Sequence, residues 1–351
     1  MTRGTLRDRP TVALTALLGL WIVLACVGSA SPRLAASNAT CTAPTDAAVQ
    51  WVRVSSTRER PSLDRWCAGV GPSIRTDARP GAEALTRPFA VVAWNTHVGA
   101  AGLDVFVADL RSGRLTSRPV GGFVLLLQET YRAGDVVPSE PGARWASAIL
   151  GAGPRSSRVE AVGLAARLGL SSIYVPSMRN GPPGITSEDR GNAILSTAPL
   201  TDVSAIELPL ERQRRVAIAA TVMVKSGTAP AVPLRLVCTH FTNMVMHHLW
   251  LLSESGRLRQ ARSLSHHLPS EGPLIVGGDF NSWFGFRDAA YRELAASLRP
   301  ATSEDRRATF GPMRLDHMLF RVPGDWHTEL RRAESKYGSD HYPVIAMISS
   351  R

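Results

Sequence analysis

The chain of 351 residues is long enough to bury a large core, either as one large domain or as two small ones. Hydrophobic residues make up 44% and charged residues 20%, which excludes a wholly disordered chain. The formal net charge is +11, and the 40 cationic residues include only two lysines, so 38 are arginines. Because guanidinium groups pair with phosphate in bidentate fashion, this charge suits an anionic partner, although a basic surface that merely keeps the protein soluble explains it equally well.

Residues 1–30 have the pattern of an export signal. A start with three arginines is followed by the apolar stretch 11–27 and by small residues, so we expect cleavage near Ser31 and an exported protein, either secreted or periplasmic. Two alternatives stay open. Cys26 could be lipidated, and the apolar stretch could remain as a membrane anchor, since it approaches the length of a bilayer span.

Residues 31–87 are predicted to be a linker followed by an N-terminal extension that packs on the main body. The first part is rich in Ala, Ser, Thr and Pro, and residues 61–70 could form one helix. In an oxidising compartment Cys41 and Cys67 form a sensible disulfide pair. Cys238 lies in an apolar run and is expected to be a buried thiol.

From residue 88 to residue 351, short apolar strands alternate with polar helices. Most of the strands are rich in Leu or β-branched residues and are bounded by Gly, Pro or Asn. The expected strands are Phe89–Asn95, Phe123–Leu127, Ser172–Val175, Asn192–Ser196, Val216–Val224, Leu234–Thr239, Leu274–Gly277, Leu315–Phe320 and Val344–Ile348. Apolar spacing of three and four predicts helices at Arg158–Leu168, Leu249–Leu268 and Arg287–Leu298. This order predicts two packed sheets flanked by helices.

Two loops rich in Gly, Pro, Ser and Arg are expected at 151–158 and 179–190. They could reach over a substrate, or they could be ordinary surface connections.

Polar side chains follow four of the apolar strands. They are Asn95, Glu129, His240, and the pair Asp279 and Asn281. If these strands run side by side, their ends form one rim, where a rigid scaffold presents catalytic groups.

The chemistry of these side chains is coherent. Asn95, Glu129 and Asp340 offer oxygen donors, which Mg²⁺, Mn²⁺ and Ca²⁺ prefer. Zinc is disfavoured, since the sequence has no Cys pair and no His-Glu-x-x-His pattern. His341 could take a proton from an attacking water if Asp316 fixes its ring.

Several short motifs resemble the endonuclease/exonuclease/phosphatase superfamily, which has the deoxyribonuclease-like fold. The likeness extends over residues 88–350 in the family's order, and its last three motifs are specific. The motifs are Trp94-Asn95-Thr96-His97, Gln128-Glu129, Gly191 to Ser196, Thr239-His240-Phe241, Arg259-Gln260, Gly278-Asp279-Phe280-Asn281, Leu315-Asp316-His317 and Ser339-Asp340-His341-Tyr342-Pro343. The resemblance implies an α+β fold: a four-layered α/β/β/α sandwich of two mainly antiparallel sheets.

The resemblance also implies a role for each site residue. Glu129 is the main metal ligand, and Asn95 and Asp340 complete the metal site. The remaining residues act on the substrate: His240 contacts the scissile phosphate and aids departure of the leaving group, Asp279 positions the water, Asn281 holds a phosphate oxygen, and His341 is the base, paired with Asp316. Phe241 and the bulky residues 244–252 depart from the family pattern, which affects the substrate groove.

The sequence therefore predicts an exported, monomeric phosphoesterase that uses Mg²⁺, with Mn²⁺ or Ca²⁺ as alternatives. A nuclease would follow a nucleic acid backbone with its arginines. A sphingomyelinase-like or inositol-phosphate-like enzyme would instead act on a phospholipid head group and contact the membrane surface through the apolar run 244–252. That run could equally begin a buried helix. A non-catalytic surface binding module is the third hypothesis.

Overall fold

The computed structural model describes residues 48–53, 57–140, 147–148, 158–182, 184–227, 229–243 and 250–351. The expected export signal, the linker up to residue 47 with Cys41, most of the loop at 151–158 and the apolar residues 244–249 lie outside this described part. Within it, no helix is both long enough and apolar enough to cross a membrane.

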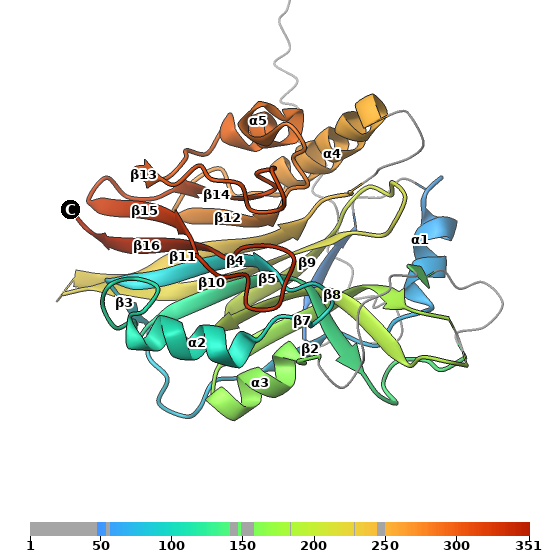
Figure 1. Cartoon of the computed structure of the whole chain (residues 1–351), viewed down its shortest axis with the longest axis horizontal. Helices are drawn as coiled ribbons and strands as arrows, with labels where there is room; N and C mark the ends of the chain where they lie inside the picture. The colour runs from blue at the N-terminus through green and yellow to red at the C-terminus, as the bar shows by residue number, and fades with distance from the viewer. Residues whose placement is uncertain are drawn as a thin grey trace, which may run out of the picture. The chain divides into compact units, whose positions relative to one another are not determined.

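Two mixed sheets pack face to face at the centre of the fold (Figure 1). Sheet A has seven strands in the order β1-β9-β10-β11-β12-β14, with β3 beside β10. Its strands are β1 (Gln50–Arg53), β3 (Leu85–Thr86), β9 (Thr201–Glu207), β10 (Val216–Ser226), β11 (Ala229–His240), β12 (Leu274–Asp279) and β14 (Asp316–Arg321).

Sheet B has nine strands in the order β13-β15-β16-β4-β5-β8-β7-β2, with β6 beside β7. Its strands are β2 (Ile74–Thr76), β4 (Phe89–Asn95), β5 (Phe123–Ala133), β6 (Ser147–Ala148), β7 (Ser171–Asn180), β8 (Glu188–Ser196), β13 (Ser303–Glu304), β15 (Trp326–Arg332) and β16 (Val344–Ser350).

Each sheet contains one parallel pair of long strands among antiparallel neighbours. In sheet B, β4 pairs with β5, and in sheet A, β11 pairs with β12. Parallel neighbours end at the same edge of a sheet. The carboxyl ends of these four strands therefore form two adjacent pairs, and this is where the functional side chains lie.

Three apolar clusters separate four layers. The first fills the space between the sheets and includes Val91 and Leu236, both fully buried. The second lies between sheet B and the helices α2 (Leu103–Ser112) and α3 (Ala161–Leu168), and the third lies between sheet A and the helices α4 (Trp250–Ser265) and α5 (Ala289–Ala295). The α/β/β/α order confirms the fold class expected from the sequence.

All nine strands and all four helical segments predicted from the sequence are present, with shifted ends. The sequence prediction missed α2, β9, β15 and the short strands β1, β2, β3, β6 and β13. The loop expected at 179–190 is shorter than predicted, because β7 continues to Asn180 and β8 begins at Glu188. Arg179 and Arg190 are buried in these strands, so neither can reach over a substrate.

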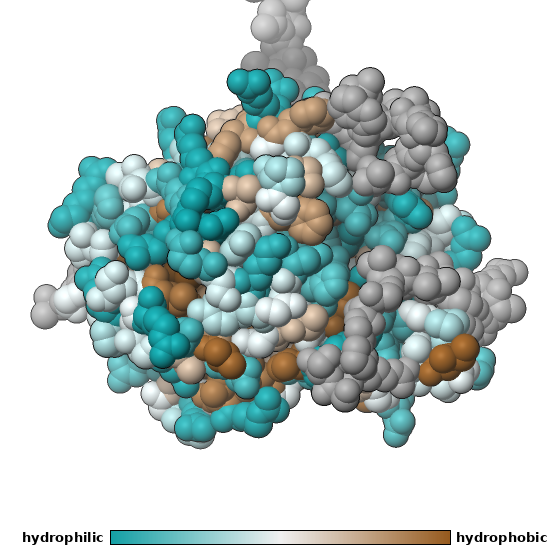
Figure 2. Space-filling model, viewed as in Figure 1, coloured by the Kyte–Doolittle hydropathy of each residue, from teal (hydrophilic) through white to brown (hydrophobic). Residues whose placement is uncertain are grey.

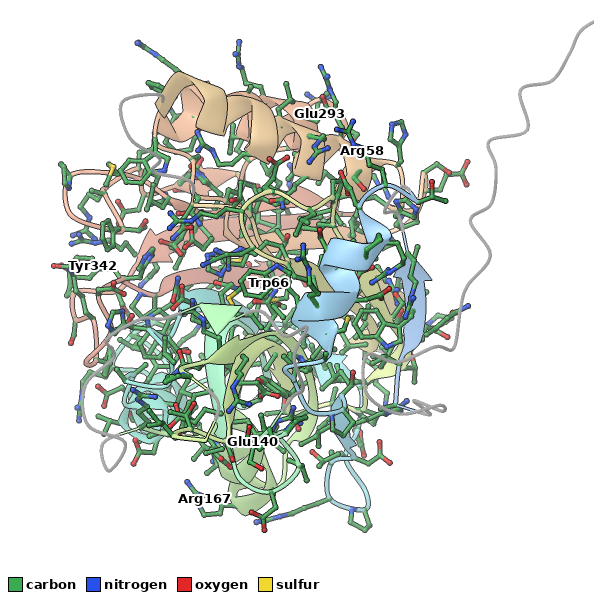
Figure 3. All side chains as sticks on the ribbon, turned by 90° about the vertical axis from the view of Figure 1, so that its right-hand side faces the viewer. Arg58, Trp66, Glu140, Arg167, Glu293 and Tyr342 are labelled. Atoms are coloured by element: carbon green, nitrogen blue, oxygen red, sulfur yellow. The ribbon has the colours of Figure 1, made fainter. Side chains whose placement is uncertain are left out.

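Residues of the N-terminal extension add strands to both sheets. β1 pairs with β9, β3 pairs with β10, and β2 pairs with β7. The helix α1 (Arg60–Cys67) carries Trp66 and faces the viewer in Figure 3. Cys67 is disulfide-bonded; its predicted partner, Cys41, lies outside the described residues, so that pairing stays a prediction. Cys238 is a buried free thiol, as expected.

The surface is mostly polar on the face shown in Figure 2, where apolar side chains form small, separate groups. Among the described residues, the exposed aromatic side chains are Trp283 and Phe284, at 36% and 41% exposure. They are neighbours in sequence and are separated from Asn281 only by Ser282.

Candidate active site

One cavity of about 290 Å³ lies where the two sheets meet at the ends of their parallel strands. Seven of the eight predicted site residues line it, and the eighth, Asp316, hydrogen-bonds to one of them. The other residues that line it are His97, Val98, Asn243, Trp283, Phe310 and Leu315. Residues far apart in the sequence thus face one space, as the hypothesis of a single site requires.

Sheet A contributes three side chains in one row. The pairing of β11, β12 and β14 aligns His240 with Asp279 and Asp279 with Asp316. Aligned residues on neighbouring strands point to the same side of a sheet, so their side chains lie close together. The two residues that end β11 and β12 and the residue that begins β14 therefore form a continuous polar strip.

Asp279 links the two sheets. Its Oδ2 accepts a hydrogen bond of 3.0 Å from Nδ2 of Asn95, the last residue of β4, and its Oδ1 accepts one of 2.8 Å from the backbone N–H of Asn281. Nδ2 of Asn281 donates to the carbonyl of Phe241 at 2.9 Å. An amide has two N–H donors, so one donor of Asn281 remains for a ligand in the cavity.

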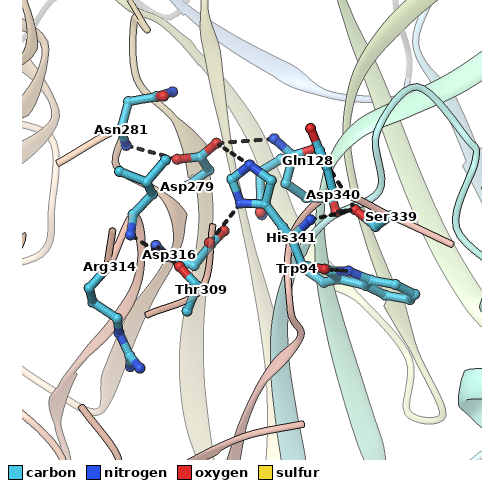
Figure 4. Close-up of polar contacts among 12 residues, drawn as sticks. Trp94, Gln128, Asp279, Asn281, Thr309, Arg314, Asp316, Ser339, Asp340 and His341 are labelled. Atoms are coloured by element: carbon cyan, nitrogen blue, oxygen red, sulfur yellow. Dashed lines mark hydrogen bonds and ion pairs between the residues drawn. The ribbon is translucent and has the colours of Figure 1, made fainter. Parts of the chain in front are cut away.

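His341 is held at both ends of its ring and on one face. Nδ1 lies 2.7 Å from Oδ2 of Asp316, and Nε2 lies 3.9 Å from Oδ2 of Asp279 (Figure 4). The ring of Phe310 packs against the imidazole at a centroid distance of 4.8 Å and a tilt of 40°. Burial alone would lower the pKa of His341, but the charge of Asp316 and its hydrogen bond, together with the charges of Asp279 and Asp340, raise that pKa to about 10. Burial raises the pKa of Asp279.

His240 has the opposite environment. Its Nδ1 lies 3.1 Å from Nη1 of Arg215, and its Nε2 lies 3.4 Å from Oδ2 of Asp279. Burial, followed by the charges of Arg215, Arg190 and His341, holds the pKa of His240 well below its usual value. The surroundings of the two histidines therefore shift their pKa values in opposite directions.

Glu129 reaches the cavity from within a strand, contrary to the expectation that it follows one. The pairing of β5 with β8 shifts between Leu127 and Thr130, and Glu129 has a positive φ of 50°. A β-bulge of this kind redirects a side chain. Here it aims the Glu129 carboxylate at the cavity, where Oε2 lies 3.2 Å from Nη1 of Arg190.

Asp340 pairs with a residue that the sequence analysis did not assign to the site. Its Oδ2 lies 2.9 Å from Nδ1 of His97. Burial would raise the pKa of Asp340, but this hydrogen bond lowers it. The hydrogen bond to Asp340, and to a lesser extent the charges of Asp340 and Glu129, raise the pKa of His97.

The donor set of Asn95, Glu129 and Asp340 fits a hard divalent cation. All three line the same cavity, and nitrogen atoms of His97 and Arg190 already lie against the two carboxylates. The amide oxygen of Asn95 accepts a hydrogen bond of 3.0 Å from the backbone N–H of His97 and keeps a second lone pair. A second group, Asp279, Asp316 and His341, has donor atoms within 4.8 Å of one another and could also hold a metal ion. It fits Mg²⁺ less well, because Asp316 and Nδ1 of His341 are already bonded to each other.

Sequence reasoning missed Arg190, Arg215 and His97. The motif that contains Asn95 also contains His97, so a signal for it was present. Each of the two arginines precedes a predicted strand, and the sequence spacing does not predict that their side chains contact residues at the ends of other strands.

The fold and the cavity together define a protein with a carboxylate–histidine centre at the rim of a two-sheet sandwich. The chain belongs to the endonuclease/exonuclease/phosphatase family, whose profile matches residues 92–341.

One solved structure supports the same fold, and two others are only distantly similar to this chain. An endonuclease/exonuclease/phosphatase from Beutenbergia cavernae is 18% identical, with 75% of this chain and 72% of that chain covered and a TM-score of 0.50. Sphingomyelinase C from Streptomyces griseocarneus is 16% identical, with 74% and 99% covered and a TM-score of 0.42. D. rerio TDP2 in complex with a single-strand DNA product is 15% identical, with 75% and 100% covered and a TM-score of 0.46. No curated protein matches the chain.

Proposed function

We propose that this protein is an exported, Mg²⁺-dependent phosphoesterase, nuclease-like in its substrate, that hydrolyses phosphodiester or phosphomonoester bonds by direct attack of water. The observation that carries the proposal is the arrangement of His341 between Asp316 and Asp279, in the cavity that Glu129 and Asp340 also line. Members of this family are generally metal-dependent phosphoesterases, which supports the class of reaction.

His341 is the general base in this proposal. In its neutral form His341 carries its proton on Nδ1, which bonds to Asp316, so Nε2 is free to take a proton from the attacking water. Asp279, on the other side of Nε2, orients that water. Phe310 covers one face of the ring and keeps it in place.

The phosphate lies between this base and the donors of the opposite wall. The free N–H of Asn281 and the Nε2 side of His240 donate to its oxygens. Glu129 and Asp340, with the amide oxygen of Asn95, would hold Mg²⁺. A bound Mg²⁺ supplies positive charge that offsets the negative charge developing on the phosphate oxygens.

Hydrolysis of a generic substrate tests the proposal first. Bis-p-nitrophenyl phosphate, plasmid DNA and phospholipid vesicles are each incubated with Mg²⁺, Mn²⁺, Ca²⁺ or chelator. We expect turnover with a divalent cation and none with chelator, and a loss of turnover of at least about 100-fold in His341→Ala. Glu293→Gln, a change on the surface of α5, is the control and keeps wild-type activity. Full activity in chelator, or in His341→Ala, contradicts the assignment.

A second candidate function is hydrolysis of a phospholipid head group. The exposed pair Trp283 and Phe284 favours it, because Trp283 also lines the catalytic cavity and aromatic side chains suit a membrane interface. Vesicle hydrolysis that exceeds DNA hydrolysis would select this function over the nuclease.

Export is part of the proposal and has its own test. The secreted protein is isolated and its N-terminus is sequenced, and we expect the mature chain to begin near Ser31. A chain that begins at a lipidated Cys26, or that retains residues 1–30, refutes cleavage at this place.

A further inference from the structure

Arg215 is a buried cation without an ion-pair partner among the described residues. Its residue exposure is 3%, its Nε has no hydrogen-bond partner, and its Nη1 contacts Nδ1 of His240 at 3.1 Å. Its sequence neighbour Arg214 is equally buried but pairs with Glu207 at 2.8 Å. Buried charges are normally paired, so the lone contact of Arg215 with a histidine of the cavity requires an explanation.

The antiparallel pairing of β10 with β11 accounts for this contact. Ile218 is opposite Cys238, so Val216, two residues along, is opposite His240. Arg215 directly precedes β10, and its side chain reaches Nδ1 of the imidazole. Together with Glu129 and Arg190, the two residues line a small second cavity of about 10 Å³ behind the catalytic one.

The contact fixes which nitrogen of His240 carries the proton. A guanidinium has only donors and stays protonated, and Arg215 remains a cation at neutral pH although burial lowers its pKa to about 10. Nδ1 of His240 must then accept, so the ring proton of the neutral imidazole is on Nε2. Nε2 is the atom on the side of Asp279 and the catalytic cavity.

We propose that Arg215 is a positioning residue that holds His240 as a neutral hydrogen-bond donor, with its proton on Nε2 directed at a phosphate oxygen of the substrate. This inference rests on the proposed function and deepens it. The family resemblance implied that His240 aids departure of the leaving group. In the arrangement seen here, His240 donates a hydrogen bond but transfers no proton.

In the proposed hydrolysis, every proton and electron pair has a destination. The water oxygen forms a bond to phosphorus, and its proton moves to Nε2 of His341. The bond between phosphorus and the leaving oxygen breaks, the electron pair goes to that oxygen, and solvent supplies its proton. His240 keeps its own proton throughout, because losing it would leave an imidazolate.

The Nδ1 atoms of the two histidines thus have partners of opposite charge. A carboxylate, Asp316, faces Nδ1 of His341 and favours a proton there, whereas a guanidinium, Arg215, faces Nδ1 of His240 and forbids one. The first histidine can accept a proton at Nε2 in its neutral form, and the second can only donate there.

Nitrogen NMR of the histidine side chains tests the tautomer without any turnover. In the full-length, metal-free wild-type protein, assigned by comparison with His240→Gln, we expect Nδ1 of His240 to give the signal of an unprotonated nitrogen and Nε2 that of a protonated one. Arg215→Lys keeps a donor and keeps this pattern. Arg215→Met removes the donor, and both tautomers then appear. A protonated Nδ1 in the wild-type protein overturns the proposal.

Kinetics test whether Arg215 acts through His240. Bis-p-nitrophenyl phosphate with Mg²⁺ is the probe, and we expect Arg215→Met to lower kcat about 100-fold, the usual effect of losing one oriented donor. In the background of His240→Ala, the same change should alter kcat less than about 2-fold, since the donor it positions is gone. An equal loss in both backgrounds overturns the proposal.

The matched control is Arg214→Lys, which changes a neighbouring buried arginine outside both cavities and is expected to leave the His240 signals unchanged. Arg215→Met leaves no carboxylate unpaired, so we expect its Tm to match that of the wild type. If this variant does not fold, the wild-type and Arg215→Lys spectra still decide the tautomer. If the wild-type protein shows no turnover, the proposed function fails while the NMR result stands on its own.

Discussion

Replacement of Asp316 by asparagine isolates the charge that holds His341. The two side chains have nearly the same size, and the backbone N–H of residue 316 can still donate to Oγ1 of Thr309, at 3.1 Å in this structure. Asp316→Asn therefore removes a negative charge from a fully buried position without opening a cavity. The amide N–H₂ can also donate to Nδ1 of His341, which places the ring proton on Nε2 and abolishes the base.

The size of the effect follows from the pKa of His341. Its surroundings raise that pKa from 6.5 to about 10, which corresponds to about 5 kcal/mol, with Asp316 as the largest favourable contribution. Asp316→Asn removes the base, and general base catalysis contributes about 10²- to 10⁴-fold, or roughly 3–5 kcal/mol. We expect kcat to fall by about 10²- to 10⁴-fold.

The assay is the rate of bis-p-nitrophenyl phosphate hydrolysis at saturating Mg²⁺, with Tm measured beside it. Asp288→Asn is the control, because Asp288 is also fully buried and pairs with Arg257 at 2.8 Å, away from the cavity. It should lower Tm and leave kcat within about 3-fold. A kcat for Asp316→Asn within 5-fold of wild type, with an unchanged Tm, would refute the assignment of His341 as the base.

Three further predictions concern other parts of the chain. Burial would raise the pKa of Glu207, but Arg214 and Arg60 lower it from 4.5 to about 2. The resulting stabilisation of about 3 kcal/mol is complete above pH 4.5 and is lost as the pH falls toward 2. Urea unfolding at pH 7 and pH 3 should therefore show this loss in the wild type and not in Glu207→Gln. Glu129→Gln should raise the Mg²⁺ concentration for half-maximal activity at least about 10-fold in a metal titration, because one charged ligand is lost. Phe284→Ala should reduce vesicle hydrolysis about 10-fold if the head-group function is right, and it should leave bis-p-nitrophenyl phosphate hydrolysis unchanged because Phe284 is not among the residues that line the cavity. Equal effects on both substrates would argue against it.

The elements that the sequence predicted share a strong apolar pattern, and those it missed have a weaker one. All residues of β4 are buried, so its apolar run was clear. In β15, buried Trp326, Thr328 and Leu330 alternate with partly exposed polar residues, and the charged residues obscured this period of two. The helix α2 mixes β-branched, aromatic and polar residues. Its end is set by Gly113, whose φ of 83° suits glycine.

The same distinction applies to the site. Asn95, His240 and Asp279 could be predicted because they end strands that pair in parallel, so linear order was enough to bring them near one edge. The contact of Arg215 with His240 depends on the alignment of two antiparallel strands, which turn chemistry and packing decide. The direction of Glu129 depends on a bulge, and linear order says nothing about it.

The chemistry depends on how closely the two sheets approach, because Asn95 of sheet B bonds to Asp279 of sheet A. Gly277, two residues before Asp279, faces side chains of sheet B. A Cβ there would come within 2.7 Å of Cγ of Met318 and 3.0 Å of Cδ1 of Leu126, a residue of the opposite sheet. Even one methyl group would have to push the sheets apart or displace a buried side chain in a close-packed core. A shift of that kind acts directly on the 3.0 Å bond between Asn95 and Asp279, so Gly277 is required by the geometry of the site as much as by the packing of the fold.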